Sequence, residues 1–185
     1  MSIALFGGWS VVSVAAERAG WVSIAWQTNW ARVPLELAGL VLWNDLHFFA
    51  IHRVLHTRWL FKHVHREHHR ALRPTPFSTY AMHPVEAAAL GSVMFLVMPL
   101  VTLSLATLLL FPMVSLTLNN LGHMSYDLVP GRSDWHPLAS SRRHALHHGR
   151  VTVNYGFLLP VLDKLFGSDR LRSGSGKLVA GEEVP

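Results

Sequence analysis

A long stretch without charge restricts the folds open to this chain more than any other feature. No Lys or Arg occurs from Pro74 to Gly131, and Ala87–Leu118 contains no acidic residue either. As a single helix this uncharged stretch would reach about 48 Å, whereas the hydrocarbon core of a bilayer is about 30 Å thick. Pro99 lies near the middle of the stretch. The sequence therefore predicts a re-entrant or two-helix hairpin, which brings the histidine-rich segments before and after it to the same membrane face.

The composition also indicates a membrane protein. Half of the 185 residues are hydrophobic, 15% are charged and the mean hydropathy is +0.27. The formal net charge is +5, but the basic residues flank apolar segments, so we expect a bilayer surface rather than nucleic acid as their partner. Six Lys and Arg between Arg53 and Arg73 and four between Arg132 and Arg150 place this face in the cytoplasm. The chain has no cysteine, which excludes disulfides, Cys-ligated clusters and thiol nucleophiles.

One membrane domain is predicted over residues 1–170. Residues 3–16 are mostly apolar and predict a first membrane helix, with a helix lying in the interface as the alternative. Val33 to His56 predicts one long helix, because Pro34 suits a first turn and a long apolar stretch follows. Residues 171–185 are predicted to form a disordered tail.

Thirteen histidines are far more than a chain of this length ordinarily carries, and eight of them form three motifs. On a helix, residues three and four apart point to one side, so each motif presents two or three imidazoles together. Eight nitrogen ligands exceed what one tetrahedral zinc needs and suit two metals, each with an open position. One HxxxH motif alone is weak, whereas all three bracketing a membrane hairpin favour metal binding. The motifs are His52-Arg-Val-Leu-His56, His65-Arg-Glu-His68-His69 and His144-Ala-Leu-His147-His148.

The order and spacing of these motifs resemble the fatty acid hydroxylase and sterol desaturase superfamily. The likeness runs from about Trp43 to Gly167, and the residues of its motifs are most similar to those of sterol C5-desaturase-like members. The chain before the first motif is shorter than in most such proteins, and Gly167-Ser168 stands where the family has Gly-Thr. The further strings that carry the resemblance are Trp43-Asn-Asp45, Thr75-Pro-Phe-Ser, His83-Pro84-Val-Glu86, Asn119-Asn-Leu-Gly122-His123, Asn154-Tyr-Gly156 and Asp163-Lys-Leu-Phe-Gly167.

The resemblance implies a fold and a ligand set. The expected fold is all-α: an integral-membrane, multi-pass helical bundle with a cytoplasmic, histidine-rich helical cap that holds a di-metal site. Asp45 shares a helical face with His52 and His56 and is the carboxylate expected to orient ligands, followed by Glu67 and Asp163. His47 is expected to pack or make a polar contact, and His63 and His136 to lie at the surface or at the membrane interface. The implied metal ligands are His52, His56, His65, His68, His69, His144, His147 and His148, with His123 as a ninth and His83 as a weaker tenth.

The resemblance also implies an activity. Two iron ions would activate O₂, and an unactivated C–H bond of a membrane lipid (a sterol, fatty acyl chain, isoprenoid or carotenoid) would be hydroxylated or desaturated. The sequence shows no GxGxxG, Cys cluster or haem-attachment motif, so electrons are expected from a separate cytochrome b5-like or ferredoxin donor. A basic patch of Arg58, Lys62, Arg66 and Arg70 is the expected docking surface.

Two other classes of function remain open from the residues alone. A membrane metal-dependent hydrolase would need a metal-activated water and a positioned base, commonly as HExxH, which the sequence lacks. A metal transporter or metal-handling protein would place ligands along a path through the membrane. Here no histidine lies between His83 and His123, which argues against transport.

Overall fold

The computed structural model describes residues 11–170 of the chain, and this part is mostly helical. The first predicted membrane helix lies partly outside the described residues, although 11–18 are helical, and the predicted tail lies wholly outside them. The elements in chain order are β1 (Ile24–Ala25), α2 (Val33–Leu55), α3 (Arg58–His63), η1 (His65–Arg70), η2 (Pro76–Tyr80), α4 (Pro84–Gly91), α5 (Val93–Val97), β2 (Leu103–Ser104), α6 (Leu105–Gly122), η3 (Pro137–Ala139), α7 (Ser140–Gly149) and α8 (Val161–Leu165), where η marks a 3-10 helix.

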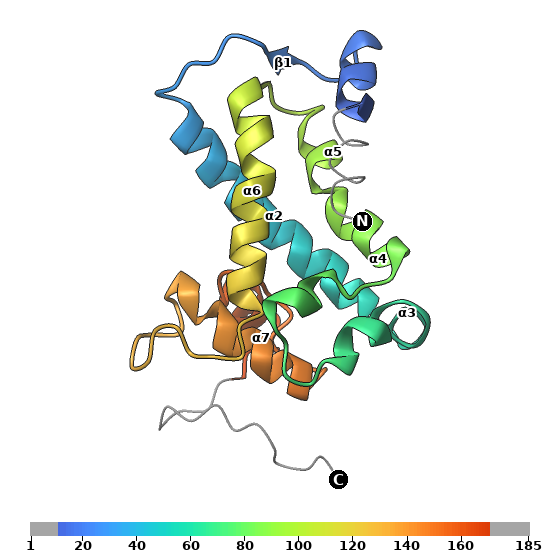
Figure 1. Ribbon diagram of the computed structural model, residues 1–185, viewed down its shortest axis with the longest axis vertical. Helices are drawn as coiled ribbons and strands as arrows, with labels where there is room; N and C mark the ends of the chain where they lie inside the picture. The colour runs from blue at the N-terminus through green and yellow to red at the C-terminus, as the bar shows by residue number, and fades with distance from the viewer. Residues whose placement is uncertain (1–10, 171–185) are drawn as a thin grey trace.

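Helix α2 confirms the long helix predicted from the sequence. It begins at Val33 with Pro34 in its first turn, where a missing N–H costs no intrahelical bond, and it ends at Leu55. Figure 1 shows α2 running the length of the bundle, from the β1 end to the end that carries α3 and α7. Because its last turn contains His52, this helix delivers the first histidine motif to that end.

The uncharged stretch forms the predicted hairpin. Helices α4 and α5 lead away from the α3 end, the chain turns through residues 98–104, and α6 returns beside α2 (Figure 1). Pro99 lies in the turn, where its lack of an N–H donor breaks no helical hydrogen bond. At this turn β2 pairs in parallel with β1, with Ile24 opposite Leu103. The hairpin therefore returns the chain to the end from which it left.

A carboxylate joins the two long helices at the turn end. The Oε2 atom of Glu36 accepts hydrogen bonds from the backbone N and the hydroxyl of Ser104, at 3.1 and 2.8 Å, and from the hydroxyl of Thr107 at 2.6 Å. Glu36 lies in the first turn of α2, and Ser104 caps α6. These bonds hold the first turns of α2 and α6 together.

Apolar side chains lie both between the helices and on their outer faces. The interior near the turn is built from seven buried residues: Ile24, Leu40, Val93, Met94, Met98, Leu103 and Phe111. On the outside, Leu35 is 77% exposed and Leu109 is 61% exposed. Among the described residues, α6 is the one helix that is long and apolar enough to cross a membrane.

The histidine-rich segments gather at the opposite end from the turn, in a region that we call the cap. It consists of α3, η1, α7 and a closing segment, residues 151–170, which contains α8 (Figure 1). Arg143 of α7 is buried and donates hydrogen bonds to the carbonyl oxygens of Asp134 and Leu158. This side chain therefore fastens the closing segment to the helix that carries the third histidine motif.

Candidate metal centre

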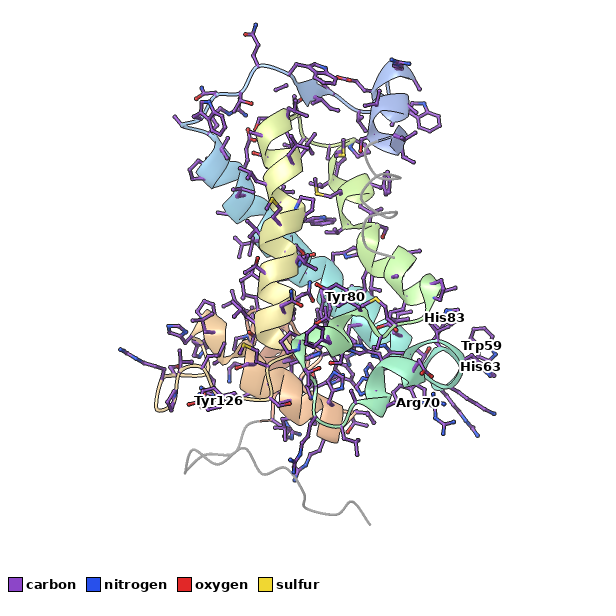
Figure 2. The ribbon with its side chains drawn as sticks, in the orientation of Figure 1. Trp59, His63, Arg70, Tyr80, His83 and Tyr126 are labelled. Carbon is purple, nitrogen blue, oxygen red and sulfur yellow. The ribbon has the colours of Figure 1, made fainter. Side chains whose placement is uncertain are left out.

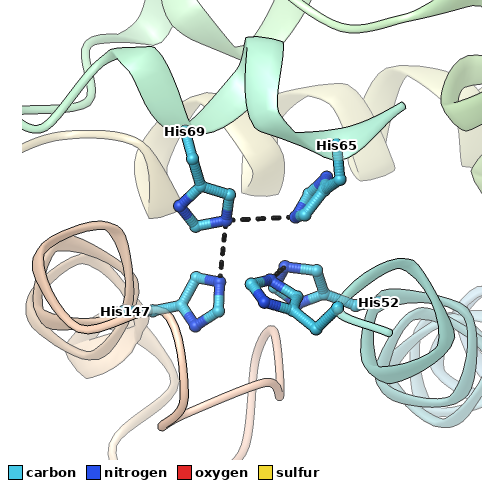
Figure 3. Close-up of side chains that lie close together, drawn as sticks. His52, His65, His69 and His147 are labelled. Atoms are coloured by element: carbon cyan, nitrogen blue, oxygen red, sulfur yellow. Dashed lines mark hydrogen bonds between the residues drawn. The ribbon is translucent and has the colours of Figure 1, made fainter. Parts of the chain in front are cut away.

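Nine histidines from four segments (the end of α2, η1, the end of α6, and α7) converge at the cap. Within each of two groups, one ring nitrogen from every histidine lies within 4.8 Å of those of all the others. Figure 3 labels His52, His65, His69 and His147 of the first group, with His65 and His69 on one side and His52 and His147 facing them. The first cluster is His52, His56, His65, His69 and His147, and the second cluster is His68, His123, His144 and His148.

The two HxxHH motifs divide their histidines between the clusters in a reciprocal way. His65 and His69, four residues apart, belong to the first cluster, while His68 belongs to the second. In the other motif His144 and His148 belong to the second cluster, and His147 belongs to the first. Each motif therefore serves both clusters, which lie against each other: the ring centroids of His69 and His148 are 4.6 Å apart.

The nitrogen atoms in the middle of the first cluster face one another in a way that calls for a cation. The Nδ1 atom of His147 donates to the Val153 carbonyl at 2.6 Å, so the Nε2 atom of this neutral ring carries a lone pair. That lone pair points at the Nε2 atom of His69 at 3.2 Å, which also lies 3.1 Å from the Nε2 atom of His65. One proton on His69 can serve only one of these neighbours, so a lone pair is left facing inward. A metal ion satisfies such lone pairs.

The second cluster repeats this arrangement. The Nδ1 atom of His123 donates to the Asn119 carbonyl at 2.9 Å, which leaves its Nε2 lone pair directed at the other rings. That Nε2 atom lies 3.3 Å from the Nε2 atom of His68 and 3.1 Å from that of His144. The Nε2 atom of His148 lies 3.1 Å from that of His144. The donor set consists of nitrogen atoms at both clusters, which fits divalent iron and also zinc.

Burial keeps these rings neutral, as metal ligation requires. Loss of solvent lowers the pKa of His65 to about 3, and the neighbouring His56 and His148 lower it further. Loss of solvent likewise lowers the pKa of His148 to about 4, with a contribution from His123, while the Ala71 carbonyl acts in the opposite direction. Both rings therefore keep a free nitrogen lone pair at neutral pH.

Glu86 orients a cluster histidine, a role that the sequence analysis did not assign to it. Its Oε1 atom lies 2.8 Å from the Nδ1 atom of His65, and both side chains are 1% exposed. A carboxylate bonded to the far nitrogen of a ligating imidazole fixes its tautomer and raises its basicity. The position of Glu86 in the sequence could have indicated this role, because it is an acidic residue directly before the uncharged stretch.

Asp45 is buried beside the site but contacts the closing segment rather than a histidine. Its Oδ1 atom accepts a hydrogen bond from the backbone N of Leu158 at 2.6 Å. Asp163 acts on the same segment, because its carboxylate accepts from the backbone N atoms of Tyr155 and Gly156 at 2.8 and 2.7 Å. The Tyr155 carbonyl in turn lies 2.8 Å from the Nδ1 atom of His52. Both carboxylates therefore act on the clusters through the backbone of the closing segment.

The remaining predicted residues lie away from the clusters. Glu67 is exposed and pairs with Arg70 at 2.8 Å. His83 is not brought into either cluster, because it precedes α4 and its Nδ1 atom accepts a hydrogen bond from the backbone N of Val85, so the ring caps the helix. Figure 2 shows His83 at the edge of the cap.

Three other histidines outside the motifs lie much as the sequence suggested. His47 is buried with its Nε2 atom 3.2 Å from the Ser92 hydroxyl, which is the polar contact expected of it. His63 is exposed, whereas His136 is half-buried and caps η3 through the backbone N of Leu138.

A small cavity adjoins both clusters. Its volume is about 20 Å³, enough for roughly one water molecule. His52 and His65 of the first cluster and His68 and His123 of the second line it on the metal side. Its other lining residues are Phe48, Met82, Glu86, Leu90 and Asn119, so the cavity faces α2, α4 and α6 rather than α3. The cluster interior thus opens toward the apolar helices.

The chain is similar in sequence to several known proteins. The chain is 28% identical to a Delta(7)-sterol 5(6)-desaturase of Leptosphaeria maculans over 74% of this chain and 37% of that protein. It is 30% identical to the very-long-chain aldehyde decarbonylase GL1-11 of Oryza sativa subsp. japonica, over 77% of this chain and 55% of that protein. It is also 30% identical to a lathosterol oxidase of Rattus norvegicus, over 76% of this chain and 46% of that protein.

The chain thus spans between 37% and 55% of the length of these three relatives. No solved structure gives a significant match. The family described as "Fatty acid hydroxylase" matches residues 37–168, which is most of the chain and includes every histidine of both clusters. The chain belongs to the fatty acid hydroxylase family.

Proposed function

We propose that this protein is a membrane-bound oxidoreductase that uses two iron ions and O₂ to hydroxylate or desaturate a C–H bond of a lipid. The observation that carries the proposal is the pair of adjoining histidine clusters inside the cap, nine rings in all. The names of the relatives support a lipid substrate, since they include sterol desaturases and a lathosterol oxidase. Whether that lipid is a sterol, a fatty acyl chain or an isoprenoid is a matter for a product screen.

The proposed ligands are the nine clustered histidines: one iron would be held by the first cluster and the other by the second. Two irons held in this way would supply the activation of O₂ toward a C–H bond. The chain's own residues orient the ligands. Glu86 holds the Nδ1 proton of His65, and the carbonyls of Tyr155 and Val153 hold those of His52 and His147.

The cavity indicates where the substrate carbon would lie. Phe48 and Leu90 give it an apolar wall on the helix side, and the clusters close it on the other. At about 20 Å³ the cavity is too small for a lipid substrate. A lipid that enters it must therefore displace a protein side chain. Met82 is the flexible member of the lining and lies in the connection before α4. An apolar wall here would keep water from the reacting carbon.

The overall reaction needs an external source of electrons. Hydroxylation follows R–H + O₂ + 2e⁻ + 2H⁺ → R–OH + H₂O. Desaturation removes two hydrogens from the substrate and gives two waters from the same O₂, two electrons and two protons. We propose a cytochrome b5-like or ferredoxin carrier as the donor.

We further propose a multi-pass arrangement in a single domain over residues 1–170, with the cap on the cytoplasmic side. Helix α6 meets the length and hydropathy of a membrane span, and α4 and α5 run beside it as a shorter apolar arm. The exposed Leu35 and Leu109 would face lipid. The basic residues of the cap support the cytoplasmic side.

The geometry gives less support to the two other classes of function. A transporter would need ligands along the bundle, whereas both clusters lie at one end of it. A hydrolase would commonly carry its base in an HExxH motif, which the sequence lacks.

The direct test is metal content together with O₂ consumption. Protein purified without oxygen and reconstituted with Fe²⁺ is expected to hold close to two irons per chain and to consume O₂ only when a chemical reductant is present. A screen with sterol, fatty acyl and isoprenoid lipids then identifies the product. One zinc or none, with no O₂ uptake under any lipid, would contradict the proposal.

A further inference from the structure

The two clusters differ in their exposure to solvent, and the exposed part lies in the first cluster. Every clustered histidine is buried except His56, which is partly exposed. The cavity that faces the apolar helices is lined by His52, His65, His68 and His123, and His56 is not among its lining residues. The metal centre therefore has an enclosed side toward the bundle and one imidazole that reaches solvent.

Aromatic rings frame His56 on this outer side. The ring centroid of Phe61, from α3, lies 5.3 Å from that of His56, and the centroid of Tyr155, from the closing segment, lies 5.0 Å from it. Helix α3 has no buried residue, so little protein covers the cluster there. A carrier protein that contacts the exposed edge of His56 would be separated from the centre of the first cluster by this one imidazole ring. This short separation matters because electron transfer slows steeply with distance.

The surface around His56 is basic. The guanidinium of Arg53 lies over the rings of Phe49, Tyr155 and Phe166, at 5.7, 5.8 and 5.1 Å from their centroids. These contacts hold the exposed cation beside the cluster. Within residues 11–170 no carboxylate pairs with it, and the same holds for Arg58 and Lys62 on α3. Arg53 thus lies beside the partly exposed His56, and the unpaired Arg58 and Lys62 lie on α3, the short helix that follows it.

We propose that this surface, made of His56, Phe61, Tyr155, Arg53, Arg58 and Lys62, is where an acidic one-electron carrier protein docks. The inference rests on the proposed function. Each visit would oxidise the carrier by one electron and reduce an iron held by the first cluster by one electron, so two visits would supply the two electrons of one turnover. Charge complementarity would steer the acidic carrier to this face.

This surface differs from the four-residue patch expected from the sequence. Arg70 of that patch is already paired with Glu67, and Arg53 was not part of it. The rival occupant is an anionic bilayer surface, which basic residues beside a membrane also attract. We favour the carrier because Arg53 lies over the ring of Tyr155, which packs against the partly exposed cluster histidine His56.

The test is the binding of a soluble carrier to the protein in nanodiscs of neutral phosphatidylcholine, with and without metal. The soluble haem domain of a cytochrome b5 and a plant-type ferredoxin are the probes, measured by biolayer interferometry at several salt concentrations. We expect salt-dependent binding of at least one probe, and R53E and K62E should each weaken it roughly tenfold. K62E provides a variant on α3 that leaves the ring contacts of Arg53 in place.

R132E is the matched control, because it makes the same charge change on the loop that contains Tyr126. Figure 2 shows that Tyr126 lies on the other side of the cap from Trp59, His63 and Arg70. R132E should leave binding within about twofold of the wild type. Equal loss in all three variants, no loss in R53E and K62E, or no binding of either probe to the wild type would overturn the inference.

Two further measurements distinguish carrier binding from lipid binding and test the proposed function separately. If R53E and K62E weaken association only with phosphatidylserine vesicles and leave carrier binding unchanged, the surface binds lipid and the inference is overturned. Iron content and O₂ uptake with a chemical reductant need no docking, so they test the proposed function independently of this result.

Discussion

The Nδ1 atom of His65 lies 2.8 Å from the Oε1 atom of Glu86, and neither side chain is exposed to solvent. The contact joins η1 to the first turn of α4 across 21 positions of sequence. Since His65 belongs to the first cluster, this carboxylate influences how firmly that cluster holds a metal.

E86Q is expected to weaken metal binding at the first cluster by roughly 10–100-fold, because an amide is a poorer acceptor for the imidazole N–H. The dissociation constant is measured by competition with a chelator, using Zn²⁺ or Fe²⁺. E67Q is the control, since Glu67 is exposed and pairs with Arg70. If E86Q and E67Q bind metal with the same affinity, Glu86 does not tune the ligand.

H123A and H83A should separate a clustered histidine from an unclustered one. His123 contacts both His68 and His144 through its Nε2 atom, so its loss removes one of the four nitrogens of the second cluster. We expect H123A to lose about one of two bound metals and H83A to keep both. Metal content by mass spectrometry of the purified variants decides this, and equal loss in both would contradict the assignment.

G156A should destabilise the closing segment. A Cβ atom at Gly156 would lie 2.7 Å from the Oδ2 atom of Asp163 and 3.0 Å from the Leu159 carbonyl. We expect a loss of about 1–3 kcal/mol in the free energy of unfolding. Thermal unfolding in detergent reports the change as a lower midpoint.

G39A is the matched control for G156A. A Cβ at Gly39 would meet nothing within 4 Å, and the residue lies inside α2. Here the same change should stabilise the helix by about 0.5–1 kcal/mol. A midpoint that falls equally in both variants would show that the closing segment accommodates the added methyl group.

The stability of the metal-free protein should fall in acid. Burial lowers the pKa of His65 to about 3 and that of His148 to about 4, from an ordinary value of 6.5. At a pH between the lowered pKa values and 6.5, the unfolded chain binds protons at these histidines that the folded chain does not. The free energy of unfolding therefore decreases as the pH drops below about 6.5. Melting midpoints from pH 7.5 to 4.5 measure this.

Added Zn²⁺ should raise these midpoints, because the metal binds the folded protein. It should raise them least at low pH, where protons compete for the histidine nitrogens. A midpoint of the metal-free protein that rises on acidification would contradict the neutral state of the buried rings.

The sequence predicted the architecture that depends on local patterns. The uncharged stretch with Pro99 predicted the hairpin, and Pro34 with the apolar residues after it predicted α2. Three spaced motifs also identified eight of the histidines that the structure brings together, and the family resemblance added His123. Patterns within single segments were enough for the hairpin, for α2 and for the three motifs.

What the sequence did not predict depends on contacts between segments. Helical spacing suggested that each HxxHH motif presents one group of rings, whereas facing segments divide each motif between two clusters. The first of these motifs also forms a 3-10 helix, His65–Arg70, rather than an α-helix. Asp45 shares a face with His52, but the nearest donor in space is the backbone N of Leu158, contributed by a segment 113 positions later.

The interior of the cap is filled by imidazoles where most folds place aliphatic side chains. Leucines attract one another in the absence of any ligand, but inward-facing nitrogen lone pairs such as those of His147 and His123 need a cation between them. Under the proposed function, a cell short of iron would therefore produce fewer correctly assembled caps as well as slower enzyme. The same rings would then govern both the stability of the cap and its chemistry.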